Sequence, residues 1–307
     1  MLSISLIGEQ PIPNLISIRA LKTEDNLLVH TSQTKEISSR LVDVLSNNKA
    51  PIFQTQQLQV DAFDFLQIRS QLKQQIDGRT DVIFNLTGGT KMMALAAYSI
   101  AAEMGVAITY FENAKNRIDR FSFENGSPIA TEPIGATSDL FTLPEYIKLY
   151  WGKYQQIGFS KQDDTDRLTP GGMFEKAIHN ALLSKVGEKN ILAGIKPEGV
   201  MGQIEIDLIL KYNNQICVIE AKHSGDDVRK RALEQVSLPS QPVYFGTFVK
   251  KVMITAAKSL PAETTELAKK MKIEIIQITG YHQAGLGSYI DQDQAEILWS
   301  KISNIMR

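Results

Sequence analysis

The residues best suited to chemistry lie in one segment, residues 205–222, in which charged side chains interrupt two apolar runs. Between the runs stands Asn213–Asn214, and asparagine tolerates the positive φ angles that tight hairpin turns require. A two-residue turn there places Asp207 directly opposite Glu220, with Cβ atoms about 5 Å apart. Because alternate residues of a strand share a face, Lys222 lies on the same side as Glu220. The spacing therefore predicts that these three charged side chains meet at one end of an apolar hairpin.

Two carboxylates at that distance repel each other, and apolar surroundings make them harder to ionise. A divalent cation removes the repulsion, and carboxylate oxygens suit Mg²⁺ or Mn²⁺. Asp207 and Glu220 are therefore predicted metal ligands. Lys222 is placed to orient or help deprotonate a water, or to stabilise charge on a phosphoryl oxygen. The alternative interpretation is a hairpin with a simple carboxylate–lysine ion pair at its rim.

A further carboxylate, Glu175, lies on the helix expected over residues 172–186. At about 100° per residue, Glu175 falls about 20° from both Leu182 and Val186, inside the apolar stripe of that helix. A carboxylate in a core-facing stripe needs a partner, which a metal ion or Lys222 would supply. We therefore expect Glu175 to join the same site.

A second set of candidates lies in two loops of the amino-terminal half, each directly after an apolar strand-like segment. The loops are Gly8–Asn14 and Thr87–Lys91, and the second leads into an expected helix. Glycine lets backbone N–H groups approach a phosphate, and the start of a helix favours an anion. Thr87, Thr90 and Lys91 would add hydroxyl donors and a positive charge. The spacing matches neither the P-loop nor the GxGxxG pattern, so the residues alone predict only an anion-binding cleft.

The elements that would position these loops alternate between strand and helix over roughly the first 125 residues. This alternation predicts a doubly wound, Rossmann-like α/β domain, in which ligands bind outside the carboxyl ends of the strands. The expected strands are Leu2–Ile7, Asn26–Ser32, Gln57–Val60, Asp81–Leu86 and Val106–Phe111, and the expected helices are Thr34–Asn48, Asp64–Ile76 and Thr90–Met104.

We expect a Rossmann-like domain over residues 1–130, a linker with one helix over 131–170, and a second α/β domain over 171–307.

Lys and Arg total 33 against 34 Asp and Glu, and this balance excludes a global basic field that would attract nucleic acid. The single cysteine excludes an internal disulfide and a cysteine-rich zinc site. No signal peptide or membrane span is recognisable, so we expect a cytoplasmic protein.

The order Glu175, Asp207, Glu220-Ala221-Lys222 resembles the PD-(D/E)xK nuclease superfamily, which has a restriction-endonuclease-like α/β fold. In that superfamily the Asp and Glu bind a metal ion, and the Lys assists hydrolysis of a phosphodiester. The resemblance implies that Glu175, Asp207, Glu220 and Lys222 are catalytic, with the three carboxylates as ligands of Mg or Mn. The sequence departs from the pattern in one place, because Ile206 stands where the superfamily often has proline before the Asp.

The two amino-terminal loops, in SLIGEQPIPN and NLTGGTKMM, resemble the CRISPR-associated Rossmann fold (CARF) domain. In that family two CARF domains dimerise, and a cyclic oligoadenylate lies across the two-fold axis. The resemblance is to CARF–nuclease fusions activated by cyclic tetraadenylate, and it implies that this chain forms a homodimer. The residues implied to line the cleft are Gln10, Ile12, Pro13, Asn14, Thr31, Ser32, Thr87, Gly88, Gly89, Thr90, Lys91 and Met92.

Together the two resemblances imply a metal-dependent nuclease of type III CRISPR defence that a cyclic oligoadenylate activates. Its substrate is left open between single-stranded DNA, RNA and nicked duplex DNA. Three alternatives remain at this point. They are a catalytically silent sensor that binds nucleic acid, a ring nuclease that degrades the activator in the CARF cleft, and a restriction-type nuclease without a nucleotide trigger.

Overall fold

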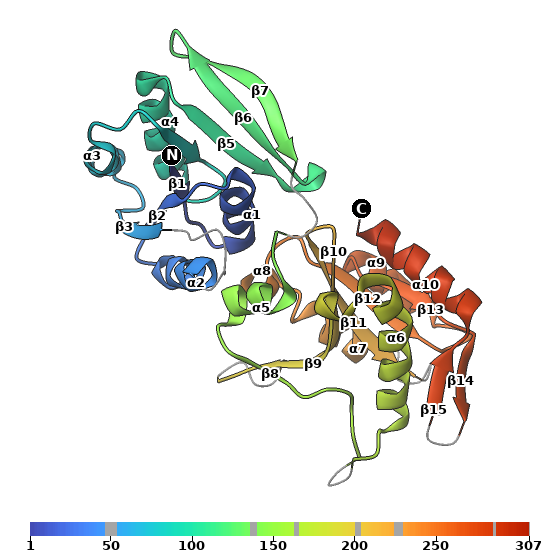
Figure 1. Ribbon diagram of the computed structural model, residues 1–307. Helices are drawn as coiled ribbons and strands as arrows, with labels where there is room; N and C mark the ends of the chain where they lie inside the picture. Colours follow the sequence, from blue (N-terminus) through green and yellow to red (C-terminus); the bar gives the residue numbers. More distant parts are fainter. Residues whose placement is uncertain are drawn as a thin grey trace. The chain divides into compact units, whose positions relative to one another are not determined.

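The computed structural model describes residues 1–46, 54–135, 140–162, 166–199, 204–223, 230–284 and 287–306. The chain divides into two compact units, Met1–Phe141 and Thr142–Arg307, and each is described by itself (Figure 1). The expected linker is shared between them. Strand β7 (Ser127–Gly135) belongs to the first unit, whereas helix α5 (Leu143–Trp151) and strand β8 (Tyr154–Gln156) belong to the second. Within the described ranges, no helix has the length and apolar character needed to cross a membrane.

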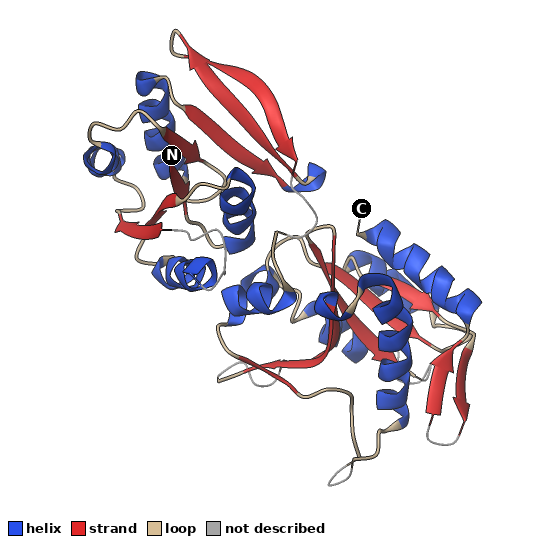
Figure 2. Cartoon of the chain, viewed as in Figure 1, coloured by secondary structure: helices blue, strands red, loops and turns tan. Residues whose placement is uncertain are grey.

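The first unit alternates strands and helices as the sequence predicts. Its elements before β7 are β1 (Leu2–Leu6), α1 (Pro11–Leu21), β2 (Asp25–His30), α2 (Lys35–Ser46), β3 (Gln54–Gln59), α3 (Phe65–Ile76), β4 (Val82–Asn85), α4 (Lys91–Met104), β5 (Ala107–Glu112), the 3₁₀ turn η1 (Asn113–Lys115) and β6 (Arg117–Glu124). They form a seven-stranded sheet of order β3-β2-β1-β4-β5-β6-β7. Strands β1 to β5 are parallel, and β6 and β7 continue the sheet as an antiparallel hairpin (Figure 2). The predicted Rossmann-like fold is confirmed.

Helices α3 and α4 share one core with one face of this sheet. Leu2, Ile4 and Leu6 of β1 belong to that core together with Ile68 of α3 and Met93 of α4. Helix α1 instead contacts β1 and α2. The chain therefore leaves β1 and β4, which are neighbours in the sheet, toward opposite faces. In an open parallel sheet, ligands bind at this kind of switch point.

Helix α1 corrects one expectation. The sequence predicts a loop over Gly8–Asn14, and this prediction is wrong because a helix begins at Pro11. Pro11 and Pro13 both lie in its first turn, where the missing N–H has no helical partner to lose. As a result Ile12 and Asn14 are buried helix residues.

The second unit is built on a six-stranded mixed sheet of order β13-β12-β11-β10-β9-β8. After β8 its elements are α6 (Pro170–Val186), the 3₁₀ turn η2 (Glu188–Asn190), β9 (Ile191–Pro197), β10 (Ile206–Tyr212), β11 (Gln215–Lys222), α7 (Lys230–Ser237), α8 (Pro242–Phe245), β12 (Lys250–Thr255), α9 (Ala262–Lys270), β13 (Glu274–Gln277), β14 (Tyr281–Ala284), β15 (Gly287–Ile290) and α10 (Gln292–Ile305). Strands β8 to β11 are antiparallel, whereas β11, β12 and β13 are parallel. Strands β14 and β15 form a separate two-stranded sheet.

Helices pack on both faces of this sheet. Helices α6 and α10 share a core with Cys217 and Ile219 of β11, whereas α7 and α9 pack around Met253 of β12. Successive residues of a strand point to opposite faces. Since Ile219 faces the α6 layer, Glu220 and Lys222 face the layer that contains α7. The alternation therefore separates the apolar side of β11 from its charged side.

Candidate active site and ligand cleft

The β10–β11 hairpin forms with the predicted register. Asn213 and Asn214 have φ angles of 50° and 56°, the left-handed geometry expected of the two-residue turn. Leu208 pairs with Ile219, so the next position outward, Asp207, lies at the level of Glu220. The turn type and strand alternation together bring the two carboxylates to one end of the hairpin.

Asp207 is held in place by the neighbouring strand. Its Oδ2 accepts a hydrogen bond from the backbone N–H of Ala221 at 2.8 Å. Burial raises the pKa of Asp207 well above its usual range, and repulsion from Glu220 and Glu175 raises it further. The Ala221 hydrogen bond and the charge of Lys222 act in the opposite direction. The side chain therefore sits where a nearby positive charge would favour its ionised form.

Glu220 is 4% exposed and forms an ion pair with Lys222, whose Nζ lies 2.6 Å from its Oε1. Burial raises the pKa of Glu220, the Lys222 ion pair lowers it, and the charges of Glu175 and Glu205 raise it again. The balance of these effects is an upward shift. Lys222 therefore offsets part of the repulsion among the carboxylates, as its spacing in the sequence suggests.

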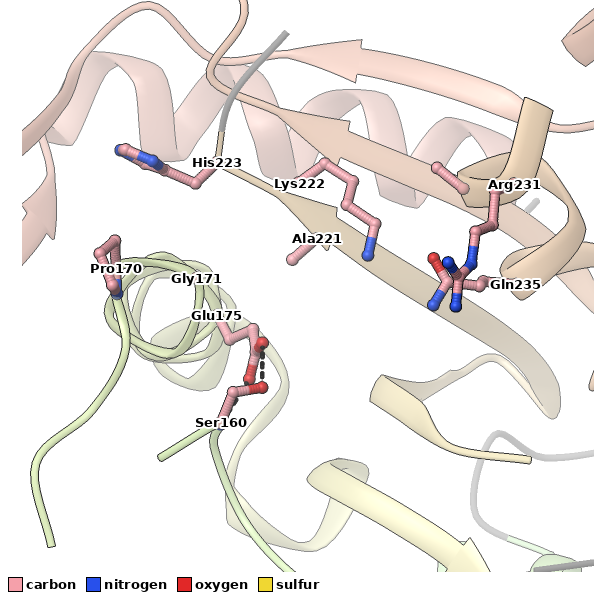
Figure 3. A pocket seen from close by; sticks show the side chains of 10 residues that line it. Ser160, Pro170, Gly171, Glu175, Ala221, Lys222, His223, Arg231 and Gln235 are labelled. Carbon is pink, nitrogen blue, oxygen red and sulfur yellow. Dashed lines mark hydrogen bonds between the residues drawn. The ribbon is translucent and has the colours of Figure 1, made fainter. Parts of the chain in front are cut away.

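Glu175 reaches the same region from helix α6, and the segment before that helix fixes its position. The Ser160 N–H donates to Oε2 of Glu175 at 3.0 Å, and the Ser160 hydroxyl donates to Oε1 at 2.8 Å. Figure 3 shows this contact between the two side chains. Gly172 permits it, because a Cβ there would lie 2.0 Å from the carbonyl oxygen of Ser160. Ser160 is a site residue that sequence reasoning missed, since nothing in its local pattern indicates a carboxylate partner.

The charged side chains line two cavities that meet at Glu175 and Lys222. One, of about 340 Å³, is lined by all the site carboxylates, including Glu205, together with Ile204, Leu238 and Pro239. The other, of about 500 Å³, is lined by Pro170, Gly171, Ala221, His223, Arg231 and Ala232. Ser160 and Gln235 line both cavities. Acidic groups are thus concentrated in the first cavity and basic groups in the second.

The chemistry of the donor atoms fits a hard divalent cation. Mg²⁺ in proteins is commonly held by one or two carboxylates and several waters, and Asp207 and Glu220 supply the two carboxylates. Among the described residues, no group of three or more His, Cys, Asp and Glu side chains is gathered to hold a metal ion. In this arrangement Glu175 is bonded to Ser160 and Glu220 to Lys222. The predicted role of Glu175 as a third ligand therefore stays a prediction.

In the first unit, the loops after β1 and β4 pack tightly against each other. A Cβ on Gly88 would lie 2.3 Å from the carbonyl oxygen of Leu6 and 2.9 Å from Nδ2 of Asn14. A Cβ on Gly8 would lie 3.1 Å from the backbone nitrogen of Gly89, whose φ is +77°. The predicted glycine loops are thus brought together at the switch point of the sheet.

A buried network of neutral polar groups holds these loops. The Asn85 amide donates to Oγ of Ser5 at 3.3 Å and to Oδ1 of Asn14 at 3.2 Å. Its own oxygen accepts from the N–H of Thr87 at 3.2 Å and from the Thr87 hydroxyl at 2.5 Å. Asn14 in turn donates to the carbonyl of Leu6 at 3.2 Å. Asn85 is a second residue that the sequence analysis missed, although an asparagine at the end of an apolar strand is a signal.

The other predicted cleft residues differ in exposure and role. The Thr90 hydroxyl caps helix α4 by accepting from the N–H of Met93, and it donates to the carbonyl of Ala62 at 2.6 Å. Thr31 is buried, as are Ile12 and Asn14, and their predicted place in the ligand cleft stays a prediction. The residues that reach solvent at least in part are Gln10, Pro13, Ser32, Thr87, Gly88, Gly89, Thr90, Lys91 and Met92.

Comparison with known proteins finds a family model that is similar to the first unit. Residues 2–134 match the family model of the Card1 CARF domain. This match and the fold confirm the resemblance drawn from the two glycine-bearing loops. No curated protein matches the chain.

Three solved structures share the fold over nearly the whole chain. Can2 from Sulfobacillus thermosulfidooxidans, in complex with cyclic tetra-adenylate, is 17% identical with a TM-score of 0.72, covering 99% of this chain and 96% of that one. Protein VC1899 from Vibrio cholerae is 13% identical with a TM-score of 0.66, covering 99% and 97%. A type III CRISPR defence DNA nuclease activated by cyclic oligoadenylate is 15% identical with a TM-score of 0.60, covering 98% of this chain and 52% of that one. At these identities the likeness shows the fold alone, and the predicted two-part α/β fold class is confirmed.

Proposed function

We propose that this chain, whose residues 2–134 match a CARF domain, is a metal-dependent nuclease of type III CRISPR defence activated by a cyclic oligoadenylate. One observation carries the nuclease assignment. Asp207, Glu220 and Lys222 meet at the end of one hairpin, and Glu175 reaches their cavity from helix α6. Residues 1–130 would sense the activator, residues 171–307 would cut nucleic acid, and the compartment would be the cytoplasm.

The proposed reaction is hydrolysis of a phosphodiester. Asp207 and Glu220 would hold Mg²⁺ or Mn²⁺, with Glu175 as a supporting group. When bound, such a cation supplies positive charge for the phosphoryl oxygens and lowers the pKa of a bound water. Lys222 would orient the attacking water, or stabilise the charge that develops as the new phosphorus–oxygen bond forms. The bond to the leaving oxygen breaks, and that oxygen takes up a proton.

The proposed activator is cyclic tetra-adenylate, bound across the two-fold axis of a homodimer. Two observations support an anionic ligand in the first unit. The tight Gly8–Gly88 approach leaves the backbone N–H groups of the β4–α4 loop next to the start of helix α4, and the start of a helix favours an anion. Can2, which shares the fold, was solved with cyclic tetra-adenylate.

The decisive experiment is cleavage of labelled single-stranded DNA, RNA and plasmid DNA in Mn²⁺, with and without cyclic tetra-adenylate. Wild-type protein would be compared with Glu220→Gln and with the matched control Glu188→Gln, an exposed carboxylate outside both cavities. We expect activator-dependent cleavage that Glu220→Gln abolishes and Glu188→Gln retains. The same assay identifies the nucleic-acid substrate.

Each contrary result points to one alternative. Tight activator binding without cleavage of any substrate would favour the catalytically silent sensor. Loss of the activator itself during incubation, unaffected by Glu220→Gln but dependent on Lys91, would favour the ring nuclease. Cleavage that ignores the activator would favour the nuclease without a nucleotide trigger.

A further inference from the structure

The cavity on the basic side of the active site has no role in the metal chemistry proposed above. It holds about 500 Å³ and lies beyond Lys222, on the side away from Asp207 and Glu220. Among the residues that the structure describes, Glu175 is the one carboxylate that lines it, and both oxygens of that group accept hydrogen bonds from Ser160. The cavity is therefore suited to an anionic group rather than to a second cation.

Two residues of helix α7 form one wall of this cavity. Arg231 and Gln235 are four residues apart, which places them on the same face of the helix. Figure 3 shows the Lys222 and Arg231 side chains directed into the same space, with the Gln235 side chain beside Arg231. The adjacent Lys230 behaves differently, because it pairs with Glu234 on the same helix at 3.6 Å. The helix therefore presents one cation to the cavity and keeps its neighbour outside.

The two adjoining cavities divide their charges, with the carboxylates along one and Arg231 along the other, and this division suits two successive phosphates of a nucleic-acid strand. The carboxylates and Lys222 surround the position where the phosphate to be hydrolysed would lie. The strand continues on either side of that phosphate, and a cationic or amide donor nearby would bind the next phosphate. The guanidinium group offers a planar fork of N–H donors that fits phosphate oxygens, and an amide N–H₂ adds a neutral donor.

We propose that Arg231, with Gln235 beside it, binds a phosphate that neighbours the hydrolysed one and thereby fixes the register of the strand in the active site. This inference rests on the proposed nuclease function. It assigns substrate positioning to helix α7, whereas the hairpin and helix α6 provide the reacting groups. Since a backbone phosphate carries no base identity, the contact serves DNA and RNA alike.

The test compares wild-type protein with Arg231→Ala, Arg231→Lys and Lys230→Ala. Lys230→Ala is the matched control, because it removes the same charge from the adjacent residue of the same helix. Cleavage of a labelled single-stranded DNA and of an RNA oligonucleotide would be followed in Mn²⁺ with cyclic tetra-adenylate, over a range of salt concentrations. Each variant's thermal unfolding would be measured beside its kinetics.

We expect Arg231→Ala to raise KM by roughly tenfold or more, as for loss of a charge-assisted hydrogen bond, with little change in kcat. The salt dependence of binding should weaken by about 0.7 in logarithmic slope, as for one single-strand phosphate contact. Arg231→Lys should keep that slope but show an intermediate KM, because it retains the charge and loses the fork. The proposal would be overturned if Arg231→Ala and Lys230→Ala had the same KM and the same logarithmic dependence of binding on salt. It would also be overturned if Arg231→Ala lowered kcat and left KM unchanged.

A failure of the proposed nuclease function is distinguishable from a failure of this inference. If the wild-type protein cleaves neither oligonucleotide, binding of the same oligonucleotides can be measured by fluorescence anisotropy without metal. Weaker binding by Arg231→Ala than by Lys230→Ala would still support a phosphate site at Arg231. Equal binding by the two variants would overturn it.

Discussion

The two candidate sites of this chain differ in how the polar side chains at their strand ends are paired. In the first unit, Asn14, Asn85 and Thr87 are neutral and bond to one another, so the loops above them are held without an external partner. In the second unit, Asp207 and Glu220 face each other with raised pKa values, and Lys222 forms an ion pair with Glu220. The first arrangement is already satisfied, whereas the second gains stability from an added positive charge. The difference agrees with the proposal that the first unit binds an anion and the second a cation.

The variant with the largest expected effect on this contrast is Asp207→Asn. We expect cleavage to fall by roughly 10²- to 10³-fold, because the variant removes the charge of a proposed metal ligand from the centre of the site. The affinity for the activator, measured by isothermal titration calorimetry, should not change. A loss of activator affinity comparable to the loss of cleavage would contradict the separation of the two clefts.

The counterpart in the first unit is Gly88→Ala. The added Cβ would meet the carbonyl oxygen of Leu6 at 2.3 Å, so the β1 and β4 loops must move apart. We expect a loss of stability of about 1–3 kcal/mol and a weaker activator affinity, measured by thermal unfolding and calorimetry. Gly135→Ala is the control, since a Cβ there meets nothing within 4 Å. Unchanged stability and affinity in Gly88→Ala would show that the loops are not tightly fixed.

A third test uses pH in metal-free buffer. Burial and repulsion raise the pKa values of Asp207 and Glu220 above their usual 3.8 and 4.5. Between the unfolded-state and the folded-state pKa values, the folded protein therefore binds more protons than the unfolded protein. The favourable contribution of these two groups to the free energy of unfolding is complete at pH values below their unfolded-state pKa values. It is lost as the pH rises through their folded-state pKa values. Denaturant unfolding with EDTA should therefore show stability falling over this interval.

The same titration has two internal controls. Asp207→Asn should flatten the pH dependence, and Mn²⁺ should restore stability at the upper end by binding the ionised carboxylates. Glu188→Gln should behave as wild type. A pH dependence that is identical in wild type and Asp207→Asn would show that the carboxylates do not repel each other in the folded protein.

The smallest expected effect is that of Lys91→Ala. Lys91 is exposed at the start of helix α4, where its charge would add to the proposed anion site at the backbone N–H groups of that helix. We expect the activator affinity to fall about two- to fivefold, an effect that salt should weaken. Lys35→Ala, at the start of helix α2, is the control. An unchanged affinity would assign the recognition of phosphate to the backbone alone.

Several features follow from local sequence, and for a common physical reason. The Asn213–Asn214 turn and strand alternation fix which residues of the hairpin face one another, so the meeting of Asp207, Glu220 and Lys222 could be predicted. The 3.6-residue period placed Glu175 on the inner face of its helix. The alternation of apolar strands and helices predicted the fold of the first unit. Each of these depends on neighbours within about a dozen residues.

Other features depend on packing between distant segments. Ser160 binds Glu175 because the chain before helix α6 passes close to Gly172. Asn85 joins β4 to β1 across the switch point. The prediction of a loop over Gly8–Asn14 was also wrong at the start of α1. Prolines usually break a helix, but its first turn tolerates them.

The sequence by itself therefore determined which residue types carry the chemistry and which of them share a strand or helix face. The tertiary structure decided what surrounds them. It placed four carboxylates along one cavity and Arg231 along the next, and it tied the glycine loops together through a buried amide network. The reason is that strand and helix periodicity act over a few residues, whereas burial, charge repulsion and close backbone approach are set only when remote segments pack together.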